Sequence, residues 1–160
     1  MKNLLPHKVY LGLGTNLGDR EGNILQAIRL IGERVGAVVR QSSLIETEPW
    51  GFESPNKFLN AVILCETERT PREVLRLTQK IERDMGRRKK TSLNSKLSSL
   101  NYSDRPIDID ILLYDDITVD EPDLKIPHPL MYERDFVMIP LKEIEGDRRH
   151  YFKTNKTKLQ

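Results

Sequence analysis

The segment from Ile107 to Leu113 constrains the fold of this chain more than any other. Its sequence, IDIDILL, alternates between acidic and branched aliphatic residues, and this alternation predicts a β-strand with at least one buried face. Side chains two residues apart on a strand point to the same side. We therefore expect Asp108 and Asp110 to share one face, which Leu112 and Tyr114 continue, while the isoleucines share the other face.

Two carboxylates on one face of an apolar strand repel each other, and each costs several kcal/mol to desolvate. A cation bound between Asp108 and Asp110 would remove both costs. Paired oxygen ligands suit Mg²⁺, which takes one or two protein carboxylates and completes its shell with water and phosphate oxygens. The alternative is that both aspartates lie exposed on the polar face of an edge strand, but the apolar residues expected beside them weigh against it.

Composition limits the class of protein. The chain has 160 residues, 38% of them hydrophobic and 31% charged, which is typical of a globular protein. We expect a single domain over residues 1–160, with its core at 8–145 and a basic tail after 146. No apolar run is long enough to span a membrane, and no secretory signal precedes the first strand. The single cysteine, Cys65, allows no internal disulfide and indicates the reducing cytoplasm. A net charge of +2 does not by itself indicate a protein that binds nucleic acid.

The hydrophobic pattern predicts an alternation of strands and helices. Strands are expected at residues 9–13, 37–46, 58–65 and 107–113, and helices at 20–35 and 71–85, the second with a Thr70–Glu73 capping box. This is the βαββαβ order of ferredoxin-like α+β sandwiches, in which both helices pack on one face of an antiparallel sheet. A short strand at 117–119, short helical pieces at 130–145 and a mobile loop at 91–101 are also expected.

Two further groups of residues could bind a ligand. The run Arg87-Arg88-Lys89-Lys90, with Arg105 ahead of the aspartates, is either a solvated helix end or, beside a metal-binding pair, a grip on a polyphosphate. Phe58 and Asn60 share one face of their strand, where a flat heterocycle could stack on the ring while the amide reads its donors and acceptors. The alternative is that Phe58 belongs to the core and Asn60 satisfies a loop backbone group.

Other patterns are less specific. Taken singly, His128 and Arg134 fit structural or surface positions. The segment 12–18, GLGTNLG, lacks the Lys and Ser/Thr that end a P-loop, and one cysteine with three scattered histidines gives no zinc spacing. Two rival functions remain open at this point: a ferredoxin-like module that binds RNA, and a metal-dependent nucleotidyltransferase that releases pyrophosphate.

Several segments together resemble the 6-hydroxymethyl-7,8-dihydropterin pyrophosphokinases of folate biosynthesis. The matching segments are LGLGTNLGDR at 11–20, ETEPWG at 46–51, FLNAV at 58–62, RPIDIDIL at 105–112 and IPHP at 126–129. The resemblance implies a ferredoxin-like fold. It also implies the transfer of a pyrophosphoryl group from ATP to the hydroxymethyl oxygen of the pterin, which produces AMP.

The resemblance further implies roles for individual residues. Asp108 and Asp110 are expected to hold two Mg²⁺ ions between the triphosphate and the pterin hydroxyl, and the expected catalytic residues are Arg87, Arg105, Asp108 and Asp110. The pterin is expected to contact Thr47, Glu48, Trp50, Phe58, Asn60 and Phe136. ATP is expected to contact Gln79, Arg87, Arg105, His128 and Arg134. The expected partners are these two small molecules alone, with no nucleic acid and no membrane, and the expected state is a monomer.

Overall fold

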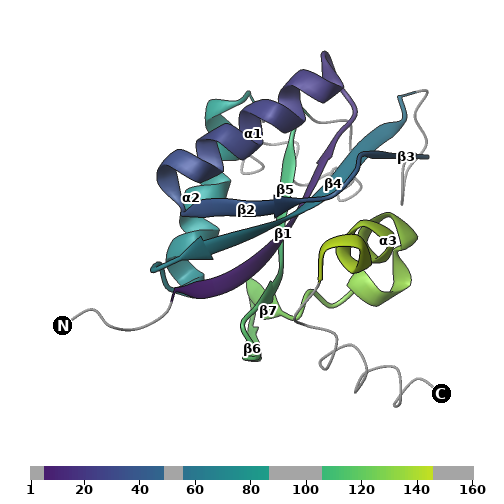
Figure 1. Cartoon of the computed structure of the whole chain (residues 1–160). Helices are drawn as coiled ribbons and strands as arrows, with labels where there is room; N and C mark the ends of the chain where they lie inside the picture. The colour runs from purple at the N-terminus through teal and green to yellow at the C-terminus, as the bar shows by residue number, and fades with distance from the viewer. Residues whose placement is uncertain (1–5, 49–55, 87–105, 146–160) are drawn as a thin grey trace.

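The structure is a computed structural model, and it describes residues 6–48, 56–86 and 106–145 (Figure 1). The strands are β1 (His7–Thr15), β2 (Ala37–Gln41), β3 (Ile45–Thr47), β4 (Phe58–Thr67), β5 (Asp108–Tyr114), β6 (Val119–Glu121) and β7 (Leu124–Ile126). The helices are α1 (Arg20–Arg34), α2 (Pro71–Asp84) and α3 (Asp135–Ile144), and a turn of 3₁₀ helix at Met131–Glu133 precedes α3.

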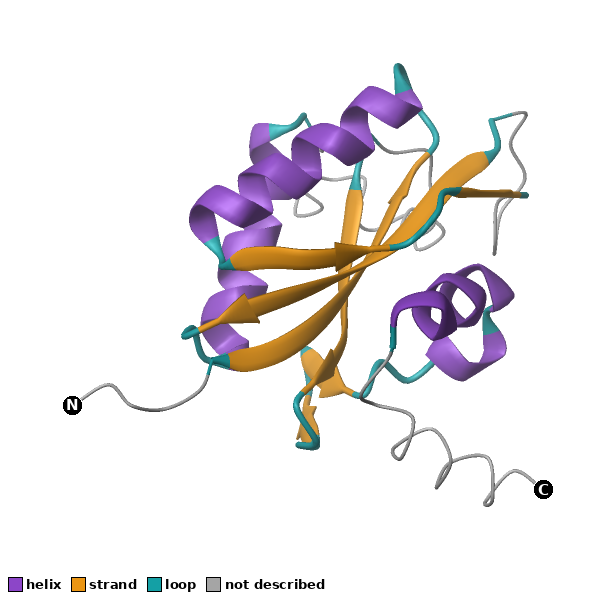
Figure 2. Ribbon diagram, in the orientation of Figure 1, coloured by secondary structure: helices purple, strands orange, loops and turns teal. Residues whose placement is uncertain are grey.

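Among the described residues, five strands form the antiparallel sheet: β2-β4-β1-β5 follow in this order, and β3 pairs with β4 beyond the end of β2. Helices α1 and α2 cover one face of the sheet, and α3 lies against the other (Figure 2). The ferredoxin-like α+β fold predicted from the order of the elements is therefore confirmed. The helical pieces expected at 130–145 are the 3₁₀ turn and α3, while β6 and β7 form a separate hairpin.

The two faces of the sheet bury different side chains. The face under α1 and α2 buries Val9, Leu11, Leu13, Ala61, Ile63, Ile107, Ile109 and Ile111. The face under α3 buries Tyr10, Val62, Leu64, Leu112 and Leu113, together with Met131, Val137 and Leu141. Neighbouring residues of a strand point to opposite faces, so both faces are apolar where a helix covers them. The predicted burial of the three isoleucines of the 107–113 strand is confirmed.

Helices α1 and α2 each begin with a side-chain cap. The Thr70 hydroxyl accepts a hydrogen bond from the Glu73 backbone N–H at 3.1 Å, and the Glu73 carboxylate accepts one from the Thr70 N–H at 2.9 Å. The predicted capping box of α2 is therefore complete. At the start of α1 the Asp19 carboxylate accepts the Gly22 N–H at 3.1 Å. These caps satisfy backbone donors that have no partner within the helix.

Two strand predictions were wrong in detail. The strand expected at 37–46 is interrupted at 42–44. There the Val62 backbone N–H donates a hydrogen bond to the Ser42 hydroxyl, at 2.9 Å, and not to a backbone carbonyl of the neighbouring strand. The strand expected at 117–119 is instead the hairpin of β6 and β7, which begins only at Val119. Strand β6, with the sequence VDE, is acidic and largely exposed, so it lacks the apolar alternation from which a strand is predicted.

Tyr114 lies on the face opposite to the predicted one. The register between β1 and β5 shifts by one residue near the end of β5. This β-bulge places Leu112 and Leu113 both on the α3 face and returns Tyr114 to the face of α1 and α2. Asp108 and Asp110 precede the bulge, so their shared face, which Leu112 continues, is as predicted.

The mobile loop expected at 91–101 and the basic tail expected after 146 lie outside the described residues. Within the described ranges, the helices are too short or too polar to cross a membrane.

Candidate functional site

Asp108, Gly14 and Asn60 form a row across three neighbouring strands. Gly14 of β1 pairs with Asp108 of β5 on one side and with Asn60 of β4 on the other. Directly opposed residues of antiparallel strands point to the same face, so the carboxylate and the amide both lie on the side of α3. Asp110 follows on that face, opposite Gly12. Glycines of β1 therefore stand between the acidic pair and the residues of β4.

Gly14 allows Asn60 and Phe58 to lie close to β1. A Cβ atom added to Gly14 would be 3.1 Å from Asn60 Oδ1 and 3.6 Å from Phe58 Cδ1. The first distance is too short for an undisturbed contact, so any side chain at position 14 would push the amide away. The absence of a side chain on Gly14 thus lets the Asn60 amide lie closer to β1 than a residue with a Cβ would allow without a shift.

The Asn60 side chain has a defined orientation. Its Nδ2 donates to Thr47 Oγ1 at 2.8 Å and to the Ile45 carbonyl oxygen at 3.3 Å, which uses both amide protons. Its Oδ1 consequently points toward β1, where the site offers a hydrogen-bond acceptor. Phe58, two residues earlier on the same face, adds an aromatic ring beside this acceptor. This part of the site could bind a flat molecule with an N–H donor on its edge.

Asp108 and Asp110 are both half-buried, and the surroundings of Asp110 disfavour negative charge. The pKa of Asp110 is raised well above its usual value, mainly because burial removes water from the carboxylate, and further because Asp108 and Glu82 add negative charge nearby. The Arg134 guanidinium acts in the opposite direction. The pair carries an unfavourable electrostatic energy that a bound cation would relieve.

The available ligands fit a hard cation that keeps most of its own shell. Among the described residues, no three His, Cys, Asp or Glu side chains are arranged to hold a metal ion together. Structural zinc and most calcium sites need more protein ligands than a carboxylate pair supplies. Mg²⁺ commonly uses one or two carboxylates and takes the rest from water and substrate phosphates. Asp108 and Asp110 therefore fit Mg²⁺ that arrives with a polyphosphate.

Sequence reasoning assigned no role to Glu82, yet this residue supports the acidic pair. Its Oε2 accepts the backbone N–H of Ile109, the residue between the two aspartates, at 2.7 Å. Glu82 lies on α2 and reaches β5, the outer strand of the sheet on this side. Only the packing of α2 against β5 brings these residues together, so no spacing in the sequence could have indicated the contact.

His128 follows β7 and is neutral at pH 7. Its backbone N–H donates to the Leu112 carbonyl oxygen at 3.0 Å, which holds this segment on β5. Its Nδ1 accepts the Leu130 N–H at 3.2 Å, so the neutral ring carries its proton on Nε2 and can donate from there. Burial and the charge of Arg134 lower the pKa of His128 to about 4, against the opposing effect of Asp108.

Arg134 connects the acidic pair with the aromatic residue of α3. Its charge influences the pKa of both Asp110 and His128, which places the guanidinium near each of them. The guanidinium also lies over the Phe136 ring, 5.6 Å from the ring centroid. Phe136 packs on the α3-side core, so it lies on the same face of the sheet as Phe58.

The structure thus brings two groups of predicted residues together across β1. One group is Asp108, Asp110, His128 and Arg134, and the other is Thr47, Phe58 and Asn60. Glu48 is exposed after β3, with Lys57 Nζ 3.6 Å from its Oε2. Gln79 is exposed on α2, one turn before Glu82. Trp50, Arg87 and Arg105 lie outside the described residues.

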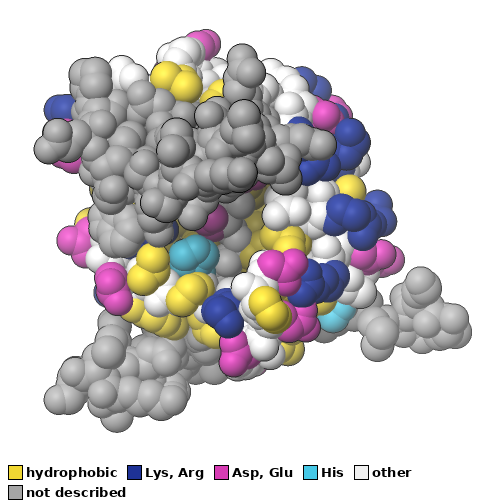
Figure 3. Space-filling model, turned by 180° about the vertical axis from the view of Figure 1, so that it is seen from behind, with side chains coloured by type: hydrophobic (Ala, Val, Ile, Leu, Met, Phe, Trp, Pro, Cys, Tyr) yellow, Lys and Arg dark blue, Asp and Glu magenta, His cyan; other side chains and the backbone are white. Residues whose placement is uncertain are grey.

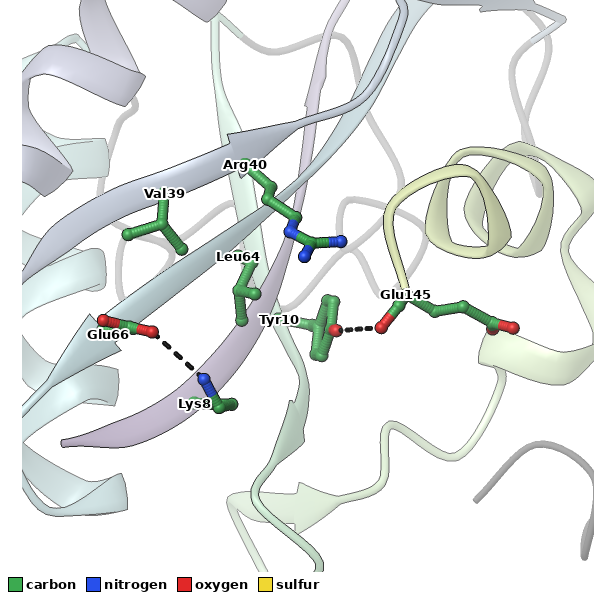
Figure 4. Close-up of a pocket in the computed structure, with 7 residues that line it drawn as sticks. All are labelled: Lys8, Tyr10, Val39, Arg40, Leu64, Glu66 and Glu145. Atoms are coloured by element: carbon green, nitrogen blue, oxygen red, sulfur yellow. Dashed lines mark hydrogen bonds and ion pairs between the residues drawn. The ribbon is translucent and has the colours of Figure 1, made fainter. Parts of the chain in front are cut away.

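A pocket of about 190 Å³ occupies the opposite end of the α3 face (Figure 4). The residues that line it are Lys8, Tyr10, Val39, Arg40, Leu64, Glu66 and Glu145. Lys8 Nζ and Glu66 Oε2 pair at 3.1 Å, and the Tyr10 hydroxyl donates to the Glu145 carbonyl oxygen at 3.0 Å. None of the predicted site residues that the structure describes lines this pocket, and it is separate from the row across β1.

Known proteins are similar in sequence to this chain over most of its length. The sequence model of a family described as 7,8-dihydro-6-hydroxymethylpterin-pyrophosphokinase (HPPK) matches residues 10–146. The 2-amino-4-hydroxy-6-hydroxymethyldihydropteridine pyrophosphokinase of Porphyromonas gingivalis is 47% identical over 137 residues, which cover 85% of this chain and 89% of the relative. The protein of the same name from Aquifex aeolicus is 40% identical over 142 residues, 89% of this chain and 82% of the relative.

Solved structures share the fold at much lower identity. A structure described as HPPK-DHPS in complex with substrates has a TM-score of 0.67 and 14% identity, and the match covers 88% of this chain and 40% of that chain. An HPPK-DHPS structure from Plasmodium falciparum has a TM-score of 0.63 and 16% identity, with 89% and 40% covered. This likeness supports the fold alone. The family match and the curated relatives together show that this chain belongs to the HPPK family.

Proposed function

We propose that this protein transfers the pyrophosphoryl group of ATP to the hydroxymethyl oxygen of 6-hydroxymethyl-7,8-dihydropterin. The products are AMP and the pterin diphosphate, an intermediate of folate biosynthesis. Membership of the HPPK family makes the chain a pyrophosphokinase. The observation that carries the assignment of the site is the row of Asp108, Gly14 and Asn60, because it sets a carboxylate pair for a metal-bound polyphosphate beside an amide and a ring for a flat heterocycle.

On the nucleotide side, Asp108 and Asp110 are assigned to hold Mg²⁺, with two ions expected. When bound, the ions neutralise the polyphosphate and stabilise the charge of the transfer. The chain itself supplies donors to phosphate oxygens: the Nε2–H of His128 and the guanidinium of Arg134. The other residues assigned to the nucleotide are Gln79, Arg87 and Arg105, of which the two arginines are also assigned as catalytic.

On the pterin side, Asn60 Oδ1 is assigned to accept an N–H of the heterocycle. Phe58 and Phe136 are assigned to stack on the two ring faces, since both lie on the same face of the sheet. Thr47 holds the Asn60 amide in its orientation. Backbone groups of Thr47, Glu48 and Trp50 are assigned to complete the pocket. A neutral ring with donors and acceptors on its edge matches a fixed amide better than it matches a charged side chain.

The reaction joins the pterin oxygen to the β-phosphorus of ATP and breaks the bond from that phosphorus to the oxygen that leaves with AMP. The pterin hydroxyl loses its proton in this exchange. Catalysis of such a transfer consists mainly of positioning and of neutralising charge. Glu82 contributes to positioning through the backbone between the two aspartates.

We further propose that the protein acts as a single-domain monomer in the cytoplasm.

Neither rival function is favoured. Family membership supports pyrophosphoryl transfer over nucleotidyl transfer. RNA binding requires a continuous basic surface. On the face shown in Figure 3, the Lys and Arg side chains of the described residues are interspersed with Asp and Glu side chains.

The nucleotide product tests this proposal. The protein is incubated with ATP, Mg²⁺ and 6-hydroxymethyl-7,8-dihydropterin, and the nucleotides are separated by chromatography. We expect AMP in equal amount to the pterin diphosphate. ADP as the sole nucleotide product would overturn the proposal, and release of pyrophosphate with a nucleotidyl-pterin would support the nucleotidyltransferase instead.

A further inference from the structure

Arg20 holds both ends of the segment that connects β3 to β4. Its Nη1 donates to the Lys57 carbonyl oxygen at 3.0 Å and lies 2.8 Å from Glu46 Oε2. Glu46 is the middle residue of β3, and Lys57 directly precedes β4. One guanidinium nitrogen at the start of α1 therefore contacts the chain on both sides of the connection.

The two ends of this connection carry the residues assigned to the pterin. Thr47 follows Glu46, Phe58 follows Lys57, and the two pair directly across β3 and β4. Asn60 donates to Thr47 Oγ1, so the direction of its amide depends on where β3 lies relative to β4. Strand β3 has only three residues and, among the described strands, pairs with β4 alone, so few described backbone hydrogen bonds hold it in place.

A second contact from the same turn strengthens this arrangement. Asn16, which is buried, donates from its Nδ2 to the Asn56 carbonyl oxygen at 3.2 Å. Asn23 of α1 donates to the Leu17 carbonyl oxygen at 2.8 Å within the turn between β1 and α1. The turn is thus tied to α1, and from it Asn16 and Arg20 reach two consecutive carbonyl groups ahead of β4.

We infer that Arg20 is a positioning residue for the pterin site. It acts by keeping β3 in register with the start of β4, which holds Thr47, Phe58 and Asn60 in their binding geometry before the ligand arrives. Its contacts lie on the β3–β4 side of the sheet, away from the acidic pair on β5. This inference rests on the proposed function and extends it to a residue outside the ligand-contacting set.

Arg20 affects the position of β3 more than it affects the stability of the whole fold. The Arg20 side chain is 33% exposed and that of Glu46 is 48% exposed, and ion pairs exposed to this degree contribute little to folding. Loss of Arg20 should therefore leave the fold intact while it loosens β3. Pterin binding should weaken, whereas nucleotide binding should not.

The test compares Arg20→Ala with Arg29→Ala. Arg29 is a matched control because it lies on the same helix and pairs with Glu33, at 3.0 Å, on the solvent side. Pterin binding is measured by the fluorescence of the pterin ring, with a non-hydrolysable ATP analogue and Mg²⁺ present, and nucleotide binding by calorimetry. We expect pterin affinity to fall about tenfold in R20A, with nucleotide affinity unchanged, and no change of either in R29A.

Two further measurements separate positioning from other effects. In the ligand-free protein, the backbone amides of β3 should exchange with deuterium faster in R20A than in the wild type or R29A. Glu46→Ala should also weaken pterin binding, and the double variant should lose less than the sum of the two single losses. Unchanged pterin affinity in R20A, or an equal loss for both ligands, would overturn the inference. A different result separates the two proposals: the wild type does not bind the pterin, but the β3 amides still exchange faster in R20A. In that case the proposed function fails, while the role of Arg20 in holding β3 is supported.

Discussion

Glu82 Oε2 accepts the backbone N–H of Ile109 at 2.7 Å, and this hydrogen bond joins α2 to the strand between Asp108 and Asp110. The strand that carries the acidic pair is thereby held on both edges, by β1 on one side and by Glu82 on the other. A carboxylate in this place has two effects. It fixes the backbone, and its charge adds to the field that raises the pKa of Asp110.

Substitution of Glu82 separates these two effects. Glu82→Gln keeps an acceptor for the Ile109 N–H and removes the charge, so we expect the pKa of Asp110 to fall while remaining above its usual value, because burial is the larger cause. Glu82→Ala removes the acceptor as well, and the Ile109 amide should exchange faster. Carboxyl NMR titration and amide exchange measure the two effects. Glu73→Ala is the control. Glu73 also lies on α2 and accepts a backbone N–H, that of Thr70, but it does so at the opposite end of the helix from Glu82. Equal Ile109 exchange in E82A and the wild type would contradict the prediction.

Removal of one acidic ligand should nearly abolish turnover. In Asp108→Ala, one of the two carboxylates assigned to Mg²⁺ is lost, so the charge of the polyphosphate is no longer balanced. We expect AMP formation at saturating Mg²⁺ to fall by about 100-fold or more. Asp120→Asn is the matched control, because Asp120 is exposed on β6 and pairs with Lys125 at 2.6 Å. Turnover of D108A at the level of D120N would rule out the metal role.

An added methyl group at position 14 should impair the pterin side alone. The Cβ of Gly14→Ala would lie 3.1 Å from Asn60 Oδ1, so the amide must move from its place. We expect weaker pterin binding, measured by fluorescence, with nucleotide binding retained. Gly32→Ala is the control: it has open space around its Cβ and lies inside α1, where alanine should stabilise the helix by about 0.5–1 kcal/mol. Pterin affinity that is equal in the two variants would argue against the assigned role of Asn60.

His128 should make the protein less stable in mild acid. Its pKa is about 4 in the folded protein, below the ordinary value of 6.5. Between these values the unfolded chain binds a proton that the folded chain does not, so the free energy of unfolding decreases as the pH falls. Linkage gives a loss of about 2 kcal/mol from pH 7 to pH 5. Urea unfolding of the wild type and of His128→Asn at both pH values measures the contribution of His128 to this loss. An equal decrease in the free energy of unfolding in the two proteins would contradict the prediction.

The local patterns of the sequence predicted most of the fold. The alternation around Asp108 and Asp110 predicted their common face, and the Thr70–Glu73 pattern predicted the start of α2. Both predictions succeeded because their causes act within a few residues: side-chain direction along a strand, and hydrogen bonds inside one helical turn. Tyr114 was misplaced because a β-bulge depends on the partner strand, which a single-strand pattern does not contain.

Of the candidate site, as of the fold, one part could be predicted from the sequence and another part depended on the tertiary structure. By itself the sequence determined which residues are candidates for the chemistry, namely the acidic pair, Asn60 and the aromatic residue two positions before it, because residue type and alternation can be read along the chain. Only the tertiary structure decided that Gly14 lies close to the Asn60 amide, that Glu82 contacts Ile109 and that Arg20 joins β3 to β4. Each of these relationships spans separate elements, so it exists only once strands pair and helices pack.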